Sequence, residues 1–177
     1  QRCTAGELIP GTPEFQQEDK DFNASRQGQH EDYNAKYIHA GKSPLTMVLK
    51  SARHVHTPAL FKAYQRKRSS MEERREYLAF HRTRKGNIAS ILSNGLLPFG
   101  HEGNATKKAT DPGYFGSCEK GVYVARYVEY TLKYTQPSEQ PLKDGEEAEI
   151  IVFKVIPGKV LHMTEKKGPI DPTPGYH

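Results

Sequence analysis

Three side chains, far apart along the chain, are the strongest candidates for a binding site. His81 closes an apolar stretch, Tyr123 lies within the apolar residues 121–125, and Tyr134 follows 11 positions later. An imidazole and two phenol rings can stack on a flat heteroaromatic group and hydrogen-bond to its polar edge. The simpler interpretation stays open at this point: both tyrosines are core aromatics whose hydroxyls are satisfied by neighbouring groups.

Other chemistry-bearing residues give weaker signals. His54 and His56 would share one face of a strand, but no cysteine or carboxylate cluster accompanies them. Cys118 lies in a glycine-containing loop beside no residue that would activate its thiol. Cys3 and Cys118 are the two cysteines, too few for a disulfide framework and typical of a reducing compartment. We therefore expect no metal site and no nucleophilic cysteine.

The charge of the chain is concentrated in one segment. The 177 residues carry a net charge of +5, and residues 46–90 alone hold 11 Lys or Arg against 3 Asp or Glu, a local excess of +8. Such a segment is either a solvated basic helix or a surface that contacts nucleic acid weakly through residues 50–85. With 35% hydrophobic residues and no long apolar run, the sequence predicts no membrane-spanning segment.

The elements that must position these residues alternate irregularly along the chain. Residues 1–43 are polar, and we expect a flexible arm with one short helix or a docked segment, followed by a domain over residues 44–177. Strands are predicted at residues 45–55, 77–82, 121–125 and 148–156, and helices from Thr57-Pro58 onward, at 85–94 ended by Gly95, and at 126–134. A long loop covers residues 98–120. This interleaving, with no glycine-rich phosphate loop, indicates an α+β fold.

Three ordered segments resemble the catalytic domain of the poly(ADP-ribose) polymerases (PARPs). They are SARHVHTPALFKAYQRKR, LAFHRTRKGNIASILSNGL and GYFGSCEKGVYVARYVEYTLKY. The resemblance covers roughly residues 45–163, and matching several segments in order is far more specific than matching one. It implies an ADP-ribosyltransferase-like fold, with split antiparallel β-sheets flanked by helices.

Within this superfamily, the chain is most similar to the TASOR-type pseudo-PARP domain and its testis-expressed meiotic paralogue. The strings that carry this similarity are GVYVARY, IIVFKVIPGKV and DPTPGYH. The resemblance implies a catalytically inactive interaction module of a nuclear protein that acts in chromatin and transcriptional silencing or in germline genome defence during meiosis. It also implies the nucleus as location and the proteins of a silencing complex as partners.

The resemblance assigns roles to five residues of an NAD-type cleft. His81 matches the histidine that hydrogen-bonds a ribose hydroxyl of NAD, and Thr83 matches the third position of the same motif. Between them stands Arg82, where the family has a glycine that presents its main chain to the nicotinamide amide. Tyr123 matches a motif tyrosine, and Tyr134 matches the ring that stacks on nicotinamide.

The catalytic glutamate of active family members has no counterpart that we can identify. Glu146, Glu147 and Glu149 precede a strand that matches an earlier strand of the family, so the late strand is expected beyond His177. We therefore predict a module that uses no cofactor. The alternative is an active mono-ADP-ribosyltransferase that uses NAD, and a basic nucleic-acid-binding domain is the third hypothesis.

Overall fold

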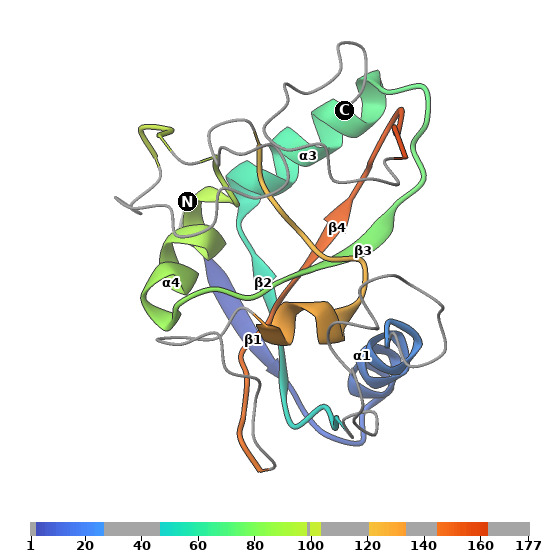
Figure 1. Ribbon diagram of the computed structural model, residues 1–177, viewed down its shortest axis with the longest axis vertical. Helices are drawn as coiled ribbons and strands as arrows, with labels where there is room; N and C mark the ends of the chain where they lie inside the picture. Colours follow the sequence, from blue (N-terminus) through green and yellow to red (C-terminus); the bar gives the residue numbers. More distant parts are fainter. Residues whose placement is uncertain (1–2, 27–46, 99, 104–120, 134–144, 163–177) are drawn as a thin grey trace.

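The protein, described here as a computed structural model, folds around two separate antiparallel sheets (Figure 1). The described residues are 3–26, 47–98, 100–103, 121–133 and 145–162. In chain order the elements are β1 (Thr4–Leu8), α1 (Pro13–Ala24), β2 (Ala52–His56), α3 (Pro58–Ser70), β3 (Tyr77–His81), α4 (Lys85–Asn94), the 3-10 helix η3 (Val128–Lys133) and β4 (Ile151–Val155). The predicted α+β class with split antiparallel sheets is confirmed.

The core of the described residues is centred on β3. This strand pairs with β4, with Tyr77 opposite Val155 and His81 opposite Ile151. On its other edge, Phe80 and Ala125 exchange two backbone hydrogen bonds of 2.8 Å each. The apolar residues buried around these contacts are Ala79, Phe80, Ile88, Ala125 and Val128. The end of β3 is therefore held from both sides.

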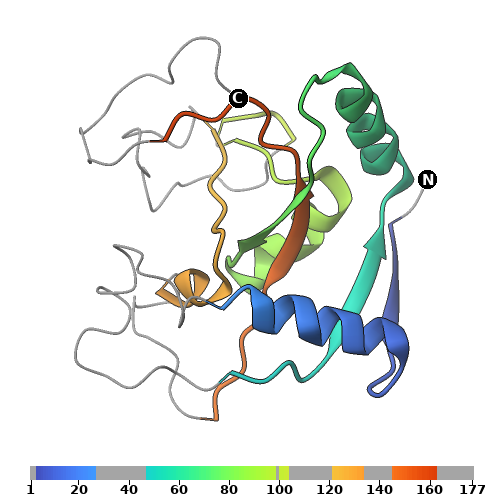
Figure 2. The same ribbon diagram turned by 90° about the vertical axis from the view of Figure 1, so that its right-hand side faces the viewer.

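The other sheet joins the beginning of the chain to the residues before α3. β1 pairs with β2, with Thr4 opposite His56. The two sheets lie in separate layers, and α1 passes the lower end of both (Figure 2). The backbone N–H of Val128 donates to Ser25 O at 3.3 Å, and His54 Nε2 lies 2.9 Å from Glu18 Oε1. These contacts tie α1 to η3 and to β2.

The arm predicted over residues 1–43, with one short helix or a docked segment, is described by the structure over residues 3–26. Residues 3–26 contain a strand and a helix, and α1 starts where Thr12 Oγ1 accepts from the Phe15 N–H at 3.3 Å, with Pro13 at the first helical position. Apolar periodicity misses such elements because ladder bonds and a cap, not a buried face, define them. The predicted boundary at residues 43 and 44 lies outside the described residues.

The two helices before and after β3 match their predictions. α3 begins after Thr57 with Pro58 in its first turn, and α4 spans the predicted residues 85–94. Gly95 ends α4 with a φ of 83°, a conformation that favours glycine. Thr57 differs from expectation, since its hydroxyl donates to Leu92 O at 2.7 Å and caps no α3 N–H. That bond joins the start of α3 to the end of α4.

The predicted strands are longer than the observed ones. Of residues 45–55, the ladder includes only those from Ala52, and of residues 148–156 it includes Ile151–Val155. Residues 121–125, predicted as a buried strand, form a single bridge at Ala125, and Val122 and Val124 are 44% and 43% exposed. A β-rich sequence fixes an extended backbone, but a strand also needs a neighbour along its whole length.

The segment predicted as a helix over residues 126–134 is a 3-10 helix in its described part, Val128–Lys133. Thr131 is fully buried there and donates from Oγ1 to Val128 O at 2.6 Å, a local bond that suits a tight helical turn. Most of the predicted loop at 98–120 lies outside the described residues. In the described part of the chain, no helix has the length and apolar character needed to cross a membrane.

Candidate functional site

His81 stands at the last position of β3 and is oriented by a backbone carbonyl. Its Nδ1 lies 3.0 Å from the carbonyl oxygen of Tyr123. Because a carbonyl can only accept, Nδ1 must carry the proton in this contact. In the neutral ring, Nε2 is then the acceptor, and the imidazole presents it away from Tyr123.

The charge state of His81 follows from its surroundings. Burial at the end of β3 lowers the pKa of His81 below its ordinary value of 6.5, and the hydrogen bond to the Tyr123 carbonyl opposes this shift. The ring is consequently neutral at pH 7, with Nδ1 as donor and Nε2 as acceptor. A neutral imidazole in this state can accept a hydrogen bond from a hydroxyl group.

The same hydrogen bond marks the place where two backbones separate. Phe80 and Ala125 form a mutual hydrogen-bonded pair, so a continued ladder would next pair Arg82 with Tyr123. The His81 side chain takes the Tyr123 carbonyl instead. The backbone of β3 therefore separates from the segment of Tyr123 and Ala125 directly after His81. Arg82 and Thr83 then lead into α4.

Arg82 is a half-buried cation next to the histidine. Burial lowers the pKa of Arg82 below its usual value, and the negative charge of Glu146 acts in the opposite direction. Removing a guanidinium from water is costly unless charges or hydrogen bonds compensate it. The Arg82 side chain is therefore partly withdrawn from solvent under the influence of a carboxylate, unlike a fully solvated surface arginine.

Thr83 belongs to the entry of α4. Asn87 Nδ2 donates to Thr83 Oγ1 at 3.0 Å, and the Asn87 N–H donates to the Arg84 carbonyl at 2.9 Å. These two bonds fix the turn between β3 and the first turn of α4, and Ile88 anchors that turn in the core. Thr83 is thus a positioning residue for the His81–Arg82 corner.

The structure brings together four of the five predicted site residues, His81, Arg82, Thr83 and Tyr123. Tyr123 enters through its backbone carbonyl, and its side chain is half-buried. The placement of Tyr134, and with it the predicted meeting of three rings, lies outside the described residues, as does Cys118. No group of three or more His, Cys, Asp or Glu side chains within the described ranges is placed to hold a metal.

Sequence reasoning missed the role of the carboxylates before β4. The negative charge of Glu146 raises the pKa of Arg82. Glu147 pairs with Lys50, and Glu149 Oε1 lies 2.6 Å from Arg53 Nη2. From the sequence alone, the three glutamates stand out only as candidates for the catalytic position. The signal that could have found these pairs is charge balance, because the acidic run before β4 complements the basic residues from 50 onward.

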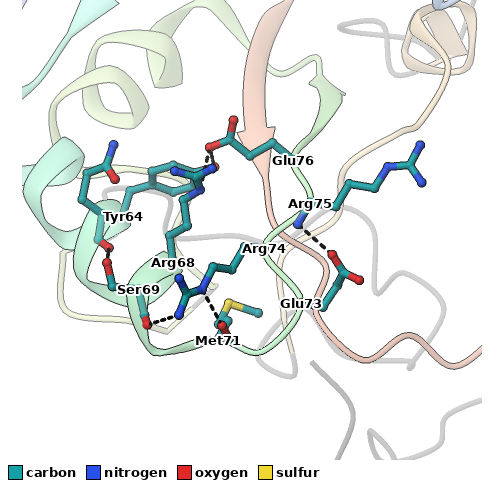
Figure 3. A network of polar contacts seen from close by, with 9 residues as sticks. Tyr64, Arg68, Ser69, Met71, Glu73, Arg74, Arg75 and Glu76 are labelled. Carbon is teal, nitrogen blue, oxygen red and sulfur yellow. Dashed lines mark hydrogen bonds and ion pairs between the residues drawn. The ribbon is translucent and has the colours of Figure 1, made fainter.

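A second polar network lies at the opposite end of β3 (Figure 3). Glu76 Oε1 accepts from the Tyr64 hydroxyl at 2.8 Å and lies 3.3 Å from Arg68 Nε. Burial, reinforced by the Glu76 carboxylate, raises the pKa of Tyr64 to about 12. Arg74 donates to the carbonyls of Met71 at 2.9 Å and Ser69 at 3.0 Å. This network joins α3 to the start of β3.

Comparisons with known proteins agree with this geometry. The family model of the poly(ADP-ribose) polymerase (PARP) catalytic domain matches residues 14–177. A search of curated proteins finds no match. Among solved structures, 15 chains match. One is the crystal structure of the TASOR pseudo-PARP domain, similar at a TM-score of 0.64 and 23% identity, over 97% of this chain and 73% of that chain.

The predicted resemblance is confirmed at the level of family and fold. The likeness to the TASOR pseudo-PARP domain, at 23% identity, establishes a shared fold. The family match starts at residue 14, within α1, so it includes part of the segment predicted as an arm. Since the match extends over far more than half of the sequence, this chain belongs to the PARP catalytic-domain family.

Proposed function

We propose that this domain is a catalytically inactive PARP-like interaction module of a nuclear protein, of the kind that acts in chromatin silencing or germline genome defence. The likeness to a domain described as a pseudo-PARP supports the proposal. One local feature carries it: an arginine, Arg82, follows His81 directly. In the family, the residue at this position is a glycine whose main chain contacts the nicotinamide amide.

Arg82 opposes nicotinamide binding for two physical reasons. A glycine has no Cβ, so a ligand can approach its backbone closely, whereas arginine fills that space with a long side chain. The Arg82 residue is also half-buried, and the negative charge of Glu146 favours its charged form, so moving the guanidinium would change this electrostatic interaction. We therefore expect a ligand to reach the backbone at this position less easily than it would beside a glycine.

The residues present fit NAD only in part. His81 Nε2 is an acceptor suited to a ribose hydroxyl, and this contact would hold one end of the ligand. NAD, when bound to an active family member, supplies the ADP-ribosyl group that is transferred. No residue of this sequence is assigned to the glutamate that stabilises charge as nicotinamide leaves.

Thermal unfolding of the full-length protein in the presence of NAD tests the proposal. A ligand that binds the folded state raises the melting temperature in proportion to the logarithm of its concentration. We expect no shift for the wild type at millimolar NAD, and a measurable shift for Arg82→Gly. Arg82→Lys keeps a long cation and should remain without a shift. A wild-type shift at micromolar NAD would contradict the proposal.

An active mono-ADP-ribosyltransferase is the second candidate, and the orientation of His81 favours it. The ring is half-buried, neutral and held through Nδ1, which is the state needed to accept from a ribose hydroxyl through Nε2. The test is transfer of labelled ADP-ribose from NAD to protein by the full-length chain. Transfer that is lost in His81→Ala would establish this candidate and overturn the inactive module.

Protein partners and a nuclear location complete the proposal. Val122 and Val124 are 44% and 43% exposed and project to one side of an extended segment, and Val152 on β4 is 47% exposed. Exposed apolar side chains beside the rigid β3 sheet offer contact area for a partner protein. Imaging of the tagged full-length protein tests the location, and exclusion from the nucleus would contradict it.

A further inference from the structure

The end of α3 presents two serine hydroxyls to solvent. Ser69 and Ser70 are the last two residues of this helix, and both are exposed. The Ser69 hydroxyl donates to the Gln65 carbonyl at 2.9 Å, and the Ser70 hydroxyl donates to the Lys67 carbonyl at 2.8 Å. Bonds from a serine to the preceding turn of its own helix slightly destabilise that helix. Neither bond joins α3 to another element, so either hydroxyl can be modified without breaking a contact between elements.

Basic side chains stand directly before Ser69. Arg66 and Lys67, three and two residues before it, are exposed and form no ion pair with a carboxylate of the described residues. Arg68, one residue before it, differs, because its Nε lies 3.3 Å from Glu76 Oε1. Two positive charges on the N-terminal side of the Ser69 hydroxyl are therefore available to another molecule, while the third is used within the fold.

We propose that Ser69 is a phosphorylation site for a protein kinase with an acidic substrate groove. Kinases select substrates by charge pattern, and carboxylates in such a groove pair with basic side chains that precede the serine. In the transfer, the Ser69 oxygen attacks the γ-phosphorus of Mg-ATP and the bond from this phosphorus to ADP breaks. The hydroxyl proton passes to the catalytic aspartate of the kinase, and the products are phosphoserine and ADP.

The surroundings favour Ser69 over Ser70 as the acceptor. For Ser70, the residues three and two positions before it are Lys67 and Arg68, and Arg68 already pairs with a carboxylate. In addition, Glu72 follows Ser70 by two positions and Ser69 by three. A negative charge opposes an acidic groove more strongly the closer it lies to the groove. Ser69 therefore matches the proposed kinase better than its neighbour does.

The place of Ser69 at the helix end makes it accessible. A kinase binds its substrate segment in an extended form, so the last turn of α3 must open. This turn ends at Met71, whose backbone is extended with a ψ of 144°, and residues 72–76 form neither helix nor strand. Two exposed bonds from Arg74, to the Ser69 and Met71 carbonyls, oppose the opening (Figure 3). Exposed bonds at the end of an element open locally at low cost.

A phosphate on Ser69 has a cation beside it. Arg74 Nη2 donates to the Ser69 carbonyl at 3.0 Å, and phosphate oxygens accept from a guanidinium more strongly than a carbonyl does. A phosphoserine adds a charge of about −2, so the excess of +8 in residues 46–90 falls to about +6. We therefore expect the modification to draw Arg74 away from the helix end and to reduce the positive field of α3.

Phosphorylation of the folded, full-length protein tests the inference. The probe is the catalytic subunit of cyclic-AMP-dependent protein kinase, which requires basic residues before the serine, together with Mg-ATP. Fragmentation mass spectrometry of the digested protein locates the phosphate. We expect it on Ser69, with Ser69→Ala left unmodified at this segment and Ser70→Ala modified at the wild-type rate.

Two matched variants of α3 separate a specific contact from net charge. Arg66→Gln removes the cation three residues before Ser69 and keeps a good helix former. We expect the phosphorylation rate at low substrate to fall about ten-fold or more, as for loss of one hydrogen-bonded ion pair with the kinase. Lys62→Gln removes a cation one turn earlier on the same exposed side and should stay within about two-fold. Equal losses in both variants would overturn the inference, as would transfer to Ser70 instead or no transfer to the folded protein.

Discussion

The two sheets of the molecule are stabilised in opposite ways. β3 buries Ala79 and Phe80, which are 3% and 2% exposed, and is bordered by β4 on one edge and by Ala125 on the other. β1 and β2 contain no buried residue. Their contacts to the rest of the described chain include the surface pairs of His54 with Glu18 and of Arg53 with Glu149.

This difference explains where a precise site can form. A ligand-binding group must be held by residues that are themselves fixed by packing. His81, the proposed binding group, follows the buried residues Ala79 and Phe80 and is oriented by the Tyr123 carbonyl. The ion pairs that join the β1–β2 sheet to other parts of the described chain are accessible to solvent, so salt weakens them. We therefore expect stability to be concentrated in β3 and its neighbours.

Removing the core of β3 should produce the largest effect. Phe80→Ala deletes a side chain that is 2% exposed, and we expect the free energy of unfolding to fall by about 3–5 kcal/mol. Urea denaturation followed by circular dichroism measures this loss. Val55→Ala on β2, where the residue is 38% exposed, is the matched change and should cost less than about 1 kcal/mol. Equal losses would contradict the contrast between the sheets.

The titration of His81 should make the β3 sheet sensitive to acid. Because its folded-state pKa lies below 6.5, the unfolded chain binds more protons between that lowered value and 6.5. The contribution of His81 to stability is thus fully present above pH 6.5 and is lost as the pH falls toward the folded-state value. Urea unfolding of the wild type from pH 7.5 to 5 measures this loss.

His81→Asn is the control for this pH dependence. The Asn amide can still donate to the Tyr123 carbonyl, but it does not titrate. We expect the variant to lose less stability than the wild type as the pH falls below 6.5. An identical pH profile would show that groups other than His81 account for the acid sensitivity.

Breaking an ion pair of the β1–β2 sheet should have the smallest effect. Arg53→Gln and Glu149→Gln, alone and combined, remove a pair whose side chains are 51% and 42% exposed. We expect a coupling energy within about 1 kcal/mol that disappears in 1 M salt. A double-mutant cycle from denaturation curves measures it. A coupling of several kcal/mol that persists in high salt would show a strong interaction in the β1–β2 sheet and would contradict the contrast between the two sheets.

The sequence predicted well those elements that carry strong local signals. Thr57-Pro58 predicted the start of α3. The apolar face of residues 85–94 and the following Gly95 predicted α4, and the alternation of residues 77–82 predicted β3. The three ordered segments that resemble the PARP catalytic domain predicted the family. Each of these signals acts within a few residues, so it does not depend on what else packs against the segment.

The remaining features depend on contacts between distant residues. The extended backbone of residues 121–125 makes one bridge because His81 takes the Tyr123 carbonyl and ends the ladder. Glu146, whose charge raises the pKa of Arg82, lies far from Arg82 in the sequence. β1 forms because its backbone pairs with β2. The polar sequence of β1, TAGEL, does not by itself predict a strand. A single sequence contains these residues but not their pairing.

Calorimetric titration of the wild-type, full-length protein with NAD tests the central claim most directly. That claim is that Arg82 closes a PARP-type nicotinamide position while the neighbouring His81 keeps its orientation. We predict no saturable heat up to millimolar NAD, with His81 still neutral at pH 7. Saturable binding with a micromolar dissociation constant, which corresponds to about 8 kcal/mol, would contradict it.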